Sequence, residues 1–367
     1  MEVDSAELLT ILGEHLVNSV IGREPFQTVK EIVDQGAPLW YQNEEEGLSA
    51  LHAAAYNQDA ELAKYLIDEG AVWNALDNYG NSAGDIALSF GDEQTYTTIR
   101  DAGIRSEMLL SLLGRKHSDA DGMVLKTDDQ TAAASTDAYL KQKLVFRKDE
   151  HGQEICLVDA GNGQEVGVMM AWETPIMEET VRLLCPPENL EGMKVLNVGF
   201  GLGIIDSLFQ SLPTRPEQHV IIEAHPDVLQ HMREQGWYER PSVKILEGKW
   251  QDFVDSEALL SFGGFDVIYT DTFSEDYQAL HEFFEHLPDL LSGPDARFGF
   301  FNGLGATNLL FYDVSTLMAE LHLSEVGINV EWTDVDVTRD SRNRWGRTRE
   351  YFTMPVYRLP IGKMSIM

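Results

Sequence analysis

The sequence predicts two domains of different fold class, an all-α repeat domain followed by an α/β domain with a mostly parallel sheet. The first 116 residues contain a pattern that recurs every thirty-three residues. From residue 139 onward, apolar stretches alternate with helical stretches, which is typical of a parallel sheet covered by helices. The segment between them, residues 117–138, has five aspartates, one lysine and no aromatic residue. Such a segment buries too little apolar surface to fold, so we expect domains at 1–116 and 139–367 joined by a flexible linker.

The repeat is visible in pairs of identical residues. Trp40 recurs at Trp73 and Gly70 recurs at Gly103, each thirty-three positions later. The stretch SALHAA at residues 49–54 is similar to the T-P-L-H-x-A signature of ankyrin repeats, which have the same period. The first domain is therefore expected to be an ankyrin-repeat stack.

Each repeat unit should contain a turn and two short helices, as at residues 49–57 and 59–69. We expect a degenerate first unit at 1–39 and a closing helix at 104–116. His52 is expected to be a structural hydrogen-bonding residue of the repeat and not a catalyst. Because ankyrin stacks usually present a concave protein-binding surface, we expect a protein partner for this domain.

The overall charge and the cysteines exclude several classes of function. The chain has 27 basic and 61 acidic residues, for a net charge of −34, which disfavours nucleic acid and anionic membranes as partners and favours a basic protein or ligand. Cys156 and Cys185 form no metal-ligand cluster, so we expect neither a disulfide framework nor a bound metal. With no long apolar run and an acidic start, the chain is expected in the cytoplasm, with the nucleus as a second compartment.

The second domain should begin with a hairpin at 144–148 and 154–158, followed by a helix starting near Thr174 and Pro175. Ligands of open parallel sheets bind beyond the carboxyl ends of the strands, so the residues there are candidates for the site. Strands are expected at 195–200, 219–223, 243–246, 265–270, 298–302, 328–337 and 351–357. Helices are expected at 227–235, 253–261 and 277–291.

The first of these strands runs into a glycine-rich turn, VLNVGFGLG at residues 195–203, in which Gly199, Gly201 and Gly203 alternate with larger residues. A turn without side chains lets a ligand approach the backbone closely. Glu223 ends the next strand, where a carboxylate can accept hydrogen bonds from both hydroxyls of a ribose. The spacing is GxGxG, which resembles motif I of S-adenosylmethionine-dependent methyltransferases, whereas dinucleotide enzymes have GxGxxG.

Two carboxylates are candidates for the chemistry. Asp271 lies in YTDTF, just past the fourth strand, and Glu173 lies in MMAWETP, in a segment that could fold over the cofactor. A carboxylate pair can hold a planar guanidinium by bidentate hydrogen bonds, and one of the two must accept its proton before the nitrogen can attack a methyl group. We assign proton acceptance to Asp271 and the clamp to Glu173; the alternative is that each is a helix cap or a surface charge.

The motifs MMAWETPIM, VLNVGFGLG, VIIEAHPDV, LEGKWQDF, DVIYTDTF and YFTMP resemble guanidinoacetate methyltransferase and its relatives. With ankyrin repeats in front, the chain resembles the fungal type IV protein arginine methyltransferases, which modify the δ-nitrogen of arginine. The resemblance implies a class I, Rossmann-like methyltransferase domain with seven strands in the order 3-2-1-4-5-7-6, and S-adenosyl-L-methionine as cofactor without a metal. Asn197 departs from the acidic residue that many methyltransferases have in motif I. The cofactor residues that it implies are Tyr139, Met169, Met177, Gly199, Phe200, Gly201, Leu202, Gly203, Ile204, Ile205, Glu223, Ala224, His225, Gly248, Lys249 and Asp271.

The sequence and the resemblance together predict an enzyme that monomethylates the δ-nitrogen of arginine in a protein substrate, for which the family suggests a ribosomal protein. One alternative is a small-molecule guanidine methyltransferase of the guanidinoacetate type. Another is an ankyrin adaptor whose methyltransferase-like domain only binds. A loop at 339–349 carries five arginines, among them Arg339 and Arg349, and is either a solvated turn or a contact for an acidic segment.

Overall fold

The structure is a computed structural model that describes residues 5–114, 135–149, 152–159, 165–189, 191–338, 345 and 348–365. The chain divides into two compact units. The first contains Met1–Met123 and Gly305–Met318, and the second contains Val124–Leu304 and Ala319–Met367. Most of the predicted linker and of the arginine-rich loop lies outside the described residues, and the predicted domain boundaries stay predictions.

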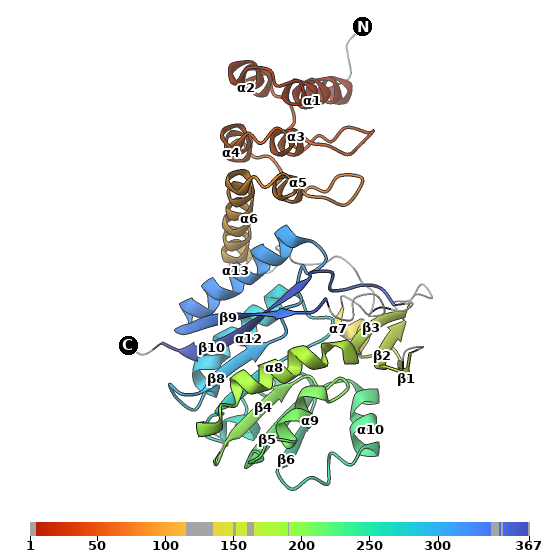
Figure 1. The fold of residues 1–367 in the computed structure, drawn as a ribbon, viewed down its shortest axis with the longest axis vertical. Coiled ribbons are helices and arrows are strands. Elements are labelled where there is room, and N and C mark those ends of the chain that lie inside the picture. The colour runs from red at the N-terminus through yellow and green to blue at the C-terminus, as the bar shows by residue number, and fades with distance from the viewer. Residues whose placement is uncertain are drawn as a thin grey trace. The chain divides into compact units, whose positions relative to one another are not determined.

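The first unit is a stack of helix pairs, as Figure 1 shows for its N-terminal part. Ser49 caps one helix by accepting a hydrogen bond from the backbone N–H of His52, whose ring Nδ1 lies 2.8 Å from the Ser49 Oγ. His52 is 1% exposed and its Nε2 lies 3.3 Å from the Asn81 carbonyl oxygen, so its predicted structural role is confirmed. The helices are α1 (Ser5–Ile21), α2 (Phe26–Asp34), α3 (Ala50–Tyr56), α4 (Ala60–Asp68), α5 (Ala83–Ser89) and α6 (Glu93–Gly114).

The predicted closing helix at 104–116 is not a separate element. Residues 104–114 are the second half of α6, which continues without a break from Glu93, and the rest of the prediction lies outside the described residues. The helix is not interrupted at Gly103, just before the predicted element, because this glycine has ordinary helical geometry. Its missing side chain is needed for packing, since a Cβ there would lie 2.8 Å from the Trp73 ring.

A helix that the sequence did not reveal, α13 (Leu309–Glu325), contributes its first half to the repeat unit. A Cβ on Gly84 would lie 2.9 Å from a methyl group of Leu310, so the two backbones approach closely. Asn308 donates a hydrogen bond of 2.5 Å to the Asp85 carboxylate, and the Tyr96 hydroxyl donates to Asp313. The repeats are thus completed by residues from far along the chain.

The second unit is built on a seven-stranded sheet in the order β6-β5-β4-β7-β8-β10-β9, which confirms the predicted fold class and strand order. The first five strands of this order are parallel, and β10 is antiparallel to both β8 and β9. Helices α8 (Thr174–Leu184) and α9 (Ile204–Gln210) contact each other, and α10 (Pro226–Glu234) and α12 (Tyr277–Leu290) complete the alternation. The strands are β4 (Lys194–Val198), β5 (Gln218–Glu223), β6 (Val243–Glu247), β7 (Val267–Thr270), β8 (Arg297–Phe300), β9 (Ile328–Asp336) and β10 (Val356–Met364).

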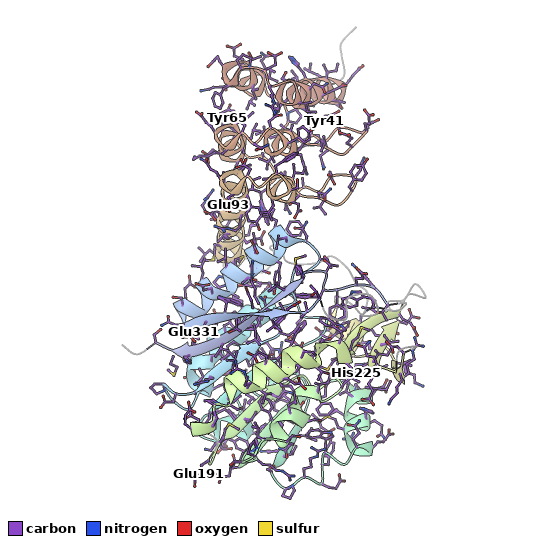
Figure 2. The ribbon with its side chains drawn as sticks, in the orientation of Figure 1. Tyr41, Tyr65, Glu93, Glu191, His225 and Glu331 are labelled. Atoms are coloured by element: carbon purple, nitrogen blue, oxygen red, sulfur yellow. The ribbon has the colours of Figure 1, made fainter. Side chains whose placement is uncertain are left out.

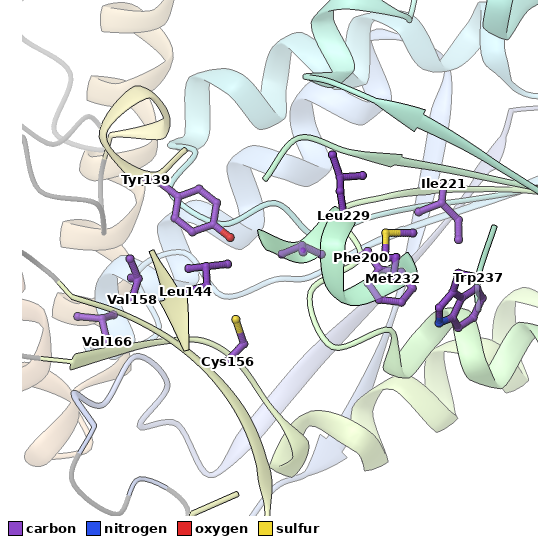
Figure 3. Close-up of a cluster of buried hydrophobic side chains, with 11 residues drawn as sticks. Tyr139, Leu144, Cys156, Val158, Val166, Phe200, Ile221, Leu229, Met232 and Trp237 are labelled. Carbon is purple, nitrogen blue, oxygen red and sulfur yellow. The ribbon is translucent and has the colours of Figure 1, made fainter. Parts of the chain in front are cut away.

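A second, three-stranded antiparallel sheet precedes the main sheet. The predicted hairpin is present as β1 (Leu144–Lys148) and β2 (Glu154–Asp159), and β3 (Glu165–Met170), which was not predicted, pairs with β2. Figure 3 shows the buried cluster that joins this sheet to the main one. In it, Tyr139, Leu144 and Cys156 lie in one group with Phe200 and Trp237. The small sheet is therefore fixed against the glycine-rich end of β4.

Two predicted elements were wrong in position. The last strand begins at Val356 and runs to Met364, so the predicted strand at 351–357 overlaps it by only two residues. The predicted helix at 253–261 is reduced to the short helix α11 (Glu257–Leu260), and a 3-10 turn at Trp250–Asp252 precedes the predicted range. Both cysteines are free and buried. None of the helices in the described ranges is long and apolar enough to cross a bilayer.

Candidate active site

A pocket opens at the carboxyl ends of β4, β5 and β7, where ligands of such sheets bind. It contains about 660 Å³ of space, open solvent at its mouth included, which is in the range of cofactor sites. The walls come from the strand ends, from β3 and from the short helix α7 (Thr136–Tyr139). Of the predicted residues, nine line it: Tyr139, Met169, Gly199, Gly201, Glu223, Ala224, Gly248, Lys249 and Asp271.

The glycine-rich turn needs its glycines for close contacts with the rest of the site. Gly199 has a φ of 92°, and a Cβ there would lie 2.0 Å from the carbonyl oxygen of Asp271. A Cβ on Gly201 would lie 2.7 Å from the sulfur of Met169, and one on Gly203 would lie 2.3 Å from the Phe200 ring. Any side chain would therefore displace backbone or ring atoms, and the turn brings bare backbone to the pocket.

Glu223 is held at the end of β5 by backbone amides. Its Oε2 accepts a hydrogen bond of 2.9 Å from the Phe200 N–H, and its Oε1 accepts one of 2.7 Å from the His225 N–H. Burial raises the pKa of Glu223, and these amide hydrogen bonds oppose that rise. A carboxylate has about four acceptor positions, so one fixed in this way can still accept hydrogen bonds from ribose hydroxyls.

Seven of the predicted cofactor residues do not line the pocket. Met177 is fully buried and accepts a hydrogen bond from the Tyr269 hydroxyl, at 3.4 Å from its sulfur. His225, labelled in Figure 2, caps the start of α10, and its Nε2 lies 3.1 Å from the Tyr139 carbonyl oxygen. The others lie in or just after the turn: Phe200, Leu202, Gly203, Ile204 and Ile205.

Tyr139 is fixed as an aromatic wall of the pocket. Its ring packs against those of His225 and Phe273, with centroids 4.6 and 4.8 Å apart. Burial raises the pKa of its hydroxyl well above the ordinary value, so the side chain is neutral. An apolar, neutral wall suits an uncharged ring of a ligand.

Of the two candidate catalytic carboxylates, Glu173 is buried and Asp271 is half-buried where it lines the pocket. Glu173 is 3% exposed, and its Oε1 accepts hydrogen bonds from the Tyr351 hydroxyl and, at 3.2 Å, from the Met170 N–H. Burial and the negative charge of Asp271 both raise the pKa of Glu173, and burial raises the pKa of Asp271. Two carboxylates that act on each other's charge in a dry site are stabilised by a cation placed between them. The arrangement can therefore hold a guanidinium and take up its proton.

Comparison with known proteins gives two family models that match successive parts of the chain. "Ankyrin repeats (3 copies)" matches residues 18–108, and "Guanidinoacetate N-methyltransferase" matches residues 162–293. Among solved structures, a spermidine synthase from Thermotoga maritima is 15% identical, with a TM-score of 0.40, covering 61% of this chain and 74% of that one. A putative methyltransferase from Thermoplasma acidophilum has 15% identity and a TM-score of 0.34, covering 47% and 69%.

Curated relatives named protein arginine N-methyltransferase 2 match over far more of the length. The protein of Cryptococcus neoformans is 42% identical and covers 100% of both chains. The chain belongs to the protein arginine N-methyltransferase 2 family. The Neurospora crassa member is 34% identical over 91% of both chains, and the Saccharomyces cerevisiae member is 34% identical over 82% of this chain and 76% of its own length.

In this member of the protein arginine N-methyltransferase 2 family, position 197 is an asparagine, and it is hydrogen-bonded to an acidic residue of the following helix α9, Asp206. Asn197 is fully buried and donates hydrogen bonds of 2.9 Å to both carboxylate oxygens of Asp206 and one of 2.8 Å to the Gly199 carbonyl oxygen. Asp206 is also fully buried and lies 3.0 Å from the His219 Nε2. The carboxylate therefore supports the glycine turn from behind and does not line the pocket.

Sequence reasoning missed several residues of the site. Tyr351 was assigned to a strand, although it is the hydrogen-bond donor to Glu173 and packs against Trp172 and Trp345, with ring centroids 5.8 and 4.6 Å away. Trp250 and Glu275 both line the pocket, and the indole N–H of Trp250 donates hydrogen bonds of 2.9 and 3.1 Å to the two carboxylate oxygens of Glu275. Trp250 directly follows the predicted Gly248 and Lys249, a signal that could have found it. The Tyr351 contact spans 178 residues, and no local pattern predicts it.

Proposed function

We propose that the chain transfers a methyl group from S-adenosyl-L-methionine to the internal δ-nitrogen of an arginine side chain in a protein substrate, leaving S-adenosyl-L-homocysteine. The observation that carries the proposal is the pair of carboxylates Glu173 and Asp271, which act on each other's charge beside a pocket that suits a nucleoside. Membership of the protein arginine N-methyltransferase 2 family supports methyl transfer to arginine. The choice of nitrogen rests on the geometry of a carboxylate clamp.

The residues present fit an S-adenosyl-L-methionine cofactor. The glycine turn leaves space that a Cβ at Gly199 or Gly201 would fill, and Glu223 lines the pocket with amide-fixed oxygens that suit ribose hydroxyls. Tyr139 offers a neutral aromatic wall. Lys249, two residues beyond the end of β6, is paired with Asp137 at 2.8 Å. When bound, the cofactor supplies an electrophilic methyl group on a sulfonium.

The carboxylates determine how the substrate is oriented. A guanidinium whose two terminal NH₂ groups donate to Glu173 and Asp271 is held in a fixed plane, and its internal nitrogen then faces the pocket. Glu173 is the fixed partner, because Tyr351 and the Met170 amide hold one of its oxygens. Holding the nitrogen in line with the methyl group should supply most of the catalysis.

Asp271 is the proton acceptor in this proposal. The guanidinium nitrogen has no free lone pair until a proton leaves, and a carboxylate whose pKa is raised by burial is a stronger base than one in water. It lies directly beyond β7 and lines the pocket, whereas Glu173 does not. Asp271 can therefore reach both the substrate and the end of the pocket at which the methyl group is delivered.

The repeat stack is proposed to recruit the protein substrate or a protein partner, in keeping with the usual role of ankyrin surfaces. A ribosomal protein is the substrate class that we propose to test first. The cytoplasm, with the nucleus as a second compartment, is the proposed location. We propose no metal requirement, because the carboxylates supply both the clamp and the base.

A small-molecule guanidine methyltransferase is the second candidate, since the model of residues 162–293 is that of guanidinoacetate N-methyltransferase. Labelled S-adenosyl-L-methionine offered with guanidinoacetate or with a protein extract separates the two. Label only in the metabolite would contradict protein methylation. A non-catalytic adaptor is the third candidate, and calorimetry that detects no cofactor binding would favour it.

Mass spectrometric fragmentation of the labelled protein tests the choice of nitrogen. We expect the methyl group on the δ-nitrogen, and a methyl group on a terminal nitrogen would overturn this part of the proposal. Asp271→Asn and Glu173→Gln should bind the cofactor nearly as wild type and lose transfer. The matched controls are Asp289→Asn and Glu188→Gln, which change exposed carboxyl groups of the same unit. Unchanged turnover in either site variant would refute the clamp.

A further inference from the structure

A second hollow lies near the amino ends of β5 and β6, among residues that the proposed reaction does not use. It is lined by Ser207 and Ser211 of α9 and its end, by Arg215 before β5, and by Arg240 and Ser242 before β6. These segments precede their strands, whereas the cofactor pocket lies beyond the carboxyl ends. We call this hollow the arginine–serine pocket. It shares no lining residue with the cofactor pocket.

The two arginines of this pocket have no acidic partner. Among the described residues, no carboxylate oxygen lies within 4.0 Å of the Arg215 or Arg240 guanidinium, although the chain carries 61 acidic residues against 27 basic ones. Elsewhere Arg147, Arg182 and Arg233 each pair with a glutamate at 2.5 to 2.6 Å. Two guanidinium groups without an acidic partner line the same hollow, so the hollow carries a local positive charge that a bound anion would neutralise.

The Arg240 guanidinium is oriented by stacking. Its central carbon lies 3.5 Å from the centroid of the Trp237 ring, and Trp237 is itself 1% exposed. A guanidinium fixed by its face keeps its N–H edge for a ligand in the same plane. Burial and the positive charge of Arg215 lower the pKa of Arg240, against a smaller opposing effect of the Asp206 carboxylate, so an anion between the two arginines would relieve their repulsion.

The floor of the pocket is fixed by a buried hydrogen-bond network. Gln210 is 8% exposed, and its Nε2 lies 3.1 Å from the His219 Nδ1 and 3.4 Å from the Ser242 Oγ. The other ring nitrogen of His219 contacts the buried carboxylate of Asp206 at 3.0 Å. Ser242 is therefore held in place before any ligand arrives, which reduces the entropy lost on binding.

We propose that the arginine–serine pocket binds a doubly charged phosphate group through the Arg215 and Arg240 guanidinium groups and the hydroxyls of its serines. Arginine and hydroxyl donors in a concave site are the usual partners of phosphate oxygens, because planar guanidinium groups bind them bidentately. A single small dianion matches two guanidinium groups in charge. A nucleic acid does not, because the net charge of −34 would repel its many other phosphates.

Two sources can supply such a group, inorganic phosphate and a phosphorylated serine side chain of a protein. Calorimetry and ³¹P nuclear magnetic resonance on the full chain, with inorganic phosphate, a phosphoserine peptide and its unphosphorylated form as probes, distinguish them. We expect saturable binding of phosphate or of the phosphopeptide and none of the unphosphorylated peptide. No saturable binding of either phosphate-bearing probe would overturn the proposal.

Arg215→Gln is the deciding variant, because Arg215 is exposed and its loss should not disturb folding. Loss of one charge-assisted contact should weaken binding about tenfold. Arg182→Gln is the matched control, since it removes the same charge from an exposed position of the same unit. Equal affinity in Arg215→Gln and wild type, or an equal loss in the control, would show that binding is not at this pocket.

Discussion

The backbone carbonyl oxygen of Asp271 occupies the place where a side chain of residue 199 would begin, 2.0 Å from the Cβ that Gly199 lacks. The two residues lie just beyond the neighbouring parallel strands β4 and β7, and the Asp271 N–H donates a hydrogen bond of 2.9 Å to the Val198 carbonyl oxygen. The cofactor turn and the proposed base are thus fixed to each other by backbone. A substitution at Gly199 or Asp271 should therefore alter the geometry of both the cofactor turn and the proposed base.

Replacement of Gly199 by alanine should therefore damage both cofactor binding and stability. An alanine in left-handed backbone geometry costs about 1 to 2 kcal/mol of unfolding free energy, and the contact with Asp271 should raise the total to on the order of 4 kcal/mol. Gly263→Ala is the matched control, because Gly263 has a φ of 71° and nothing lies within 4 Å of its Cβ position. Chemical denaturation and calorimetric titration with S-adenosyl-L-methionine measure both effects. Similar losses in the two variants would contradict the close contact.

The Tyr351 hydroxyl should set the lower pH limit of activity. Its hydrogen bond to Glu173 lowers the pKa of that carboxyl, against the effects of burial and of Asp271. The clamp needs the charged form, so activity should fall as the pH drops through a pKa that lies above the ordinary glutamate value of about 4.3. Tyr351→Phe should move this limb of the kcat/KM profile to higher pH. Tyr238→Phe, which removes a hydroxyl bonded to the exposed Glu247, should leave the limb in place.

Glu173 should make the ligand-free protein less stable at higher pH. Because its pKa is raised in the folded state, the folded chain holds this proton more tightly than the unfolded chain does. The associated stability is complete below the unfolded pKa and is lost as the pH rises through the folded one. Glu173→Gln should therefore gain on the order of 2 kcal/mol over wild type at alkaline pH, with a smaller gain in mild acid. Thermal unfolding across pH measures this, with Glu188→Gln as control; a gain independent of pH would contradict the argument.

His52 should make the repeat unit sensitive to acid. Burial lowers its pKa, so the folded state disfavours the charged ring, and stability should fall as the pH drops below the unfolded value of about 6.5. His52→Gln should flatten this dependence, while losing about 1 to 3 kcal/mol at neutral pH through weaker hydrogen bonds. Hydrogen exchange of the helix amides between neutral and mildly acid pH measures both. His15→Gln, at an exposed position of α1, should change neither.

Strand–helix alternation was sufficient to predict a mostly parallel sheet, and the family resemblance supplied its strand order. The glycine motif and the strand ends indicated where the pocket lies. Prediction from the sequence failed where local pattern and tertiary context disagree. Residues 351–357 look like a strand from their aromatic and β-branched content, whereas the real strand β10 contains Pro360 and Gly362, residues that strands usually lack. In β10, Pro360 lies opposite Trp332 of β9, whereas the pairing with β8 is confined to Gly362 and Lys363, so Pro360 itself is paired on one side.

Helix α13 was missed for a related reason. Buried residues are spread around it, since Tyr312, Asp313, Val314, Ser315 and Thr316 are buried in succession, so no single apolar face stands out in the sequence. The motif MMAWETP identified Glu173, but it did not reveal which groups surround this carboxylate. The donor Tyr351 and the charge of Asp271 reach it from segments that only the fold brings together.

The hydrogen bond between Asp85 and Asn308 joins residues that are 223 positions apart, within the unit that holds the repeats. Chains are synthesised from the N-terminus, and early domains usually fold first as they leave the ribosome. In this chain the repeats cannot complete their packing as soon as they are synthesised. Leu310 and Asp313, which cover the last helix pair, are synthesised much later. A nascent chain of this protein therefore carries an unfinished repeat stack through most of its synthesis, and a truncated product would expose apolar surface that the complete chain conceals.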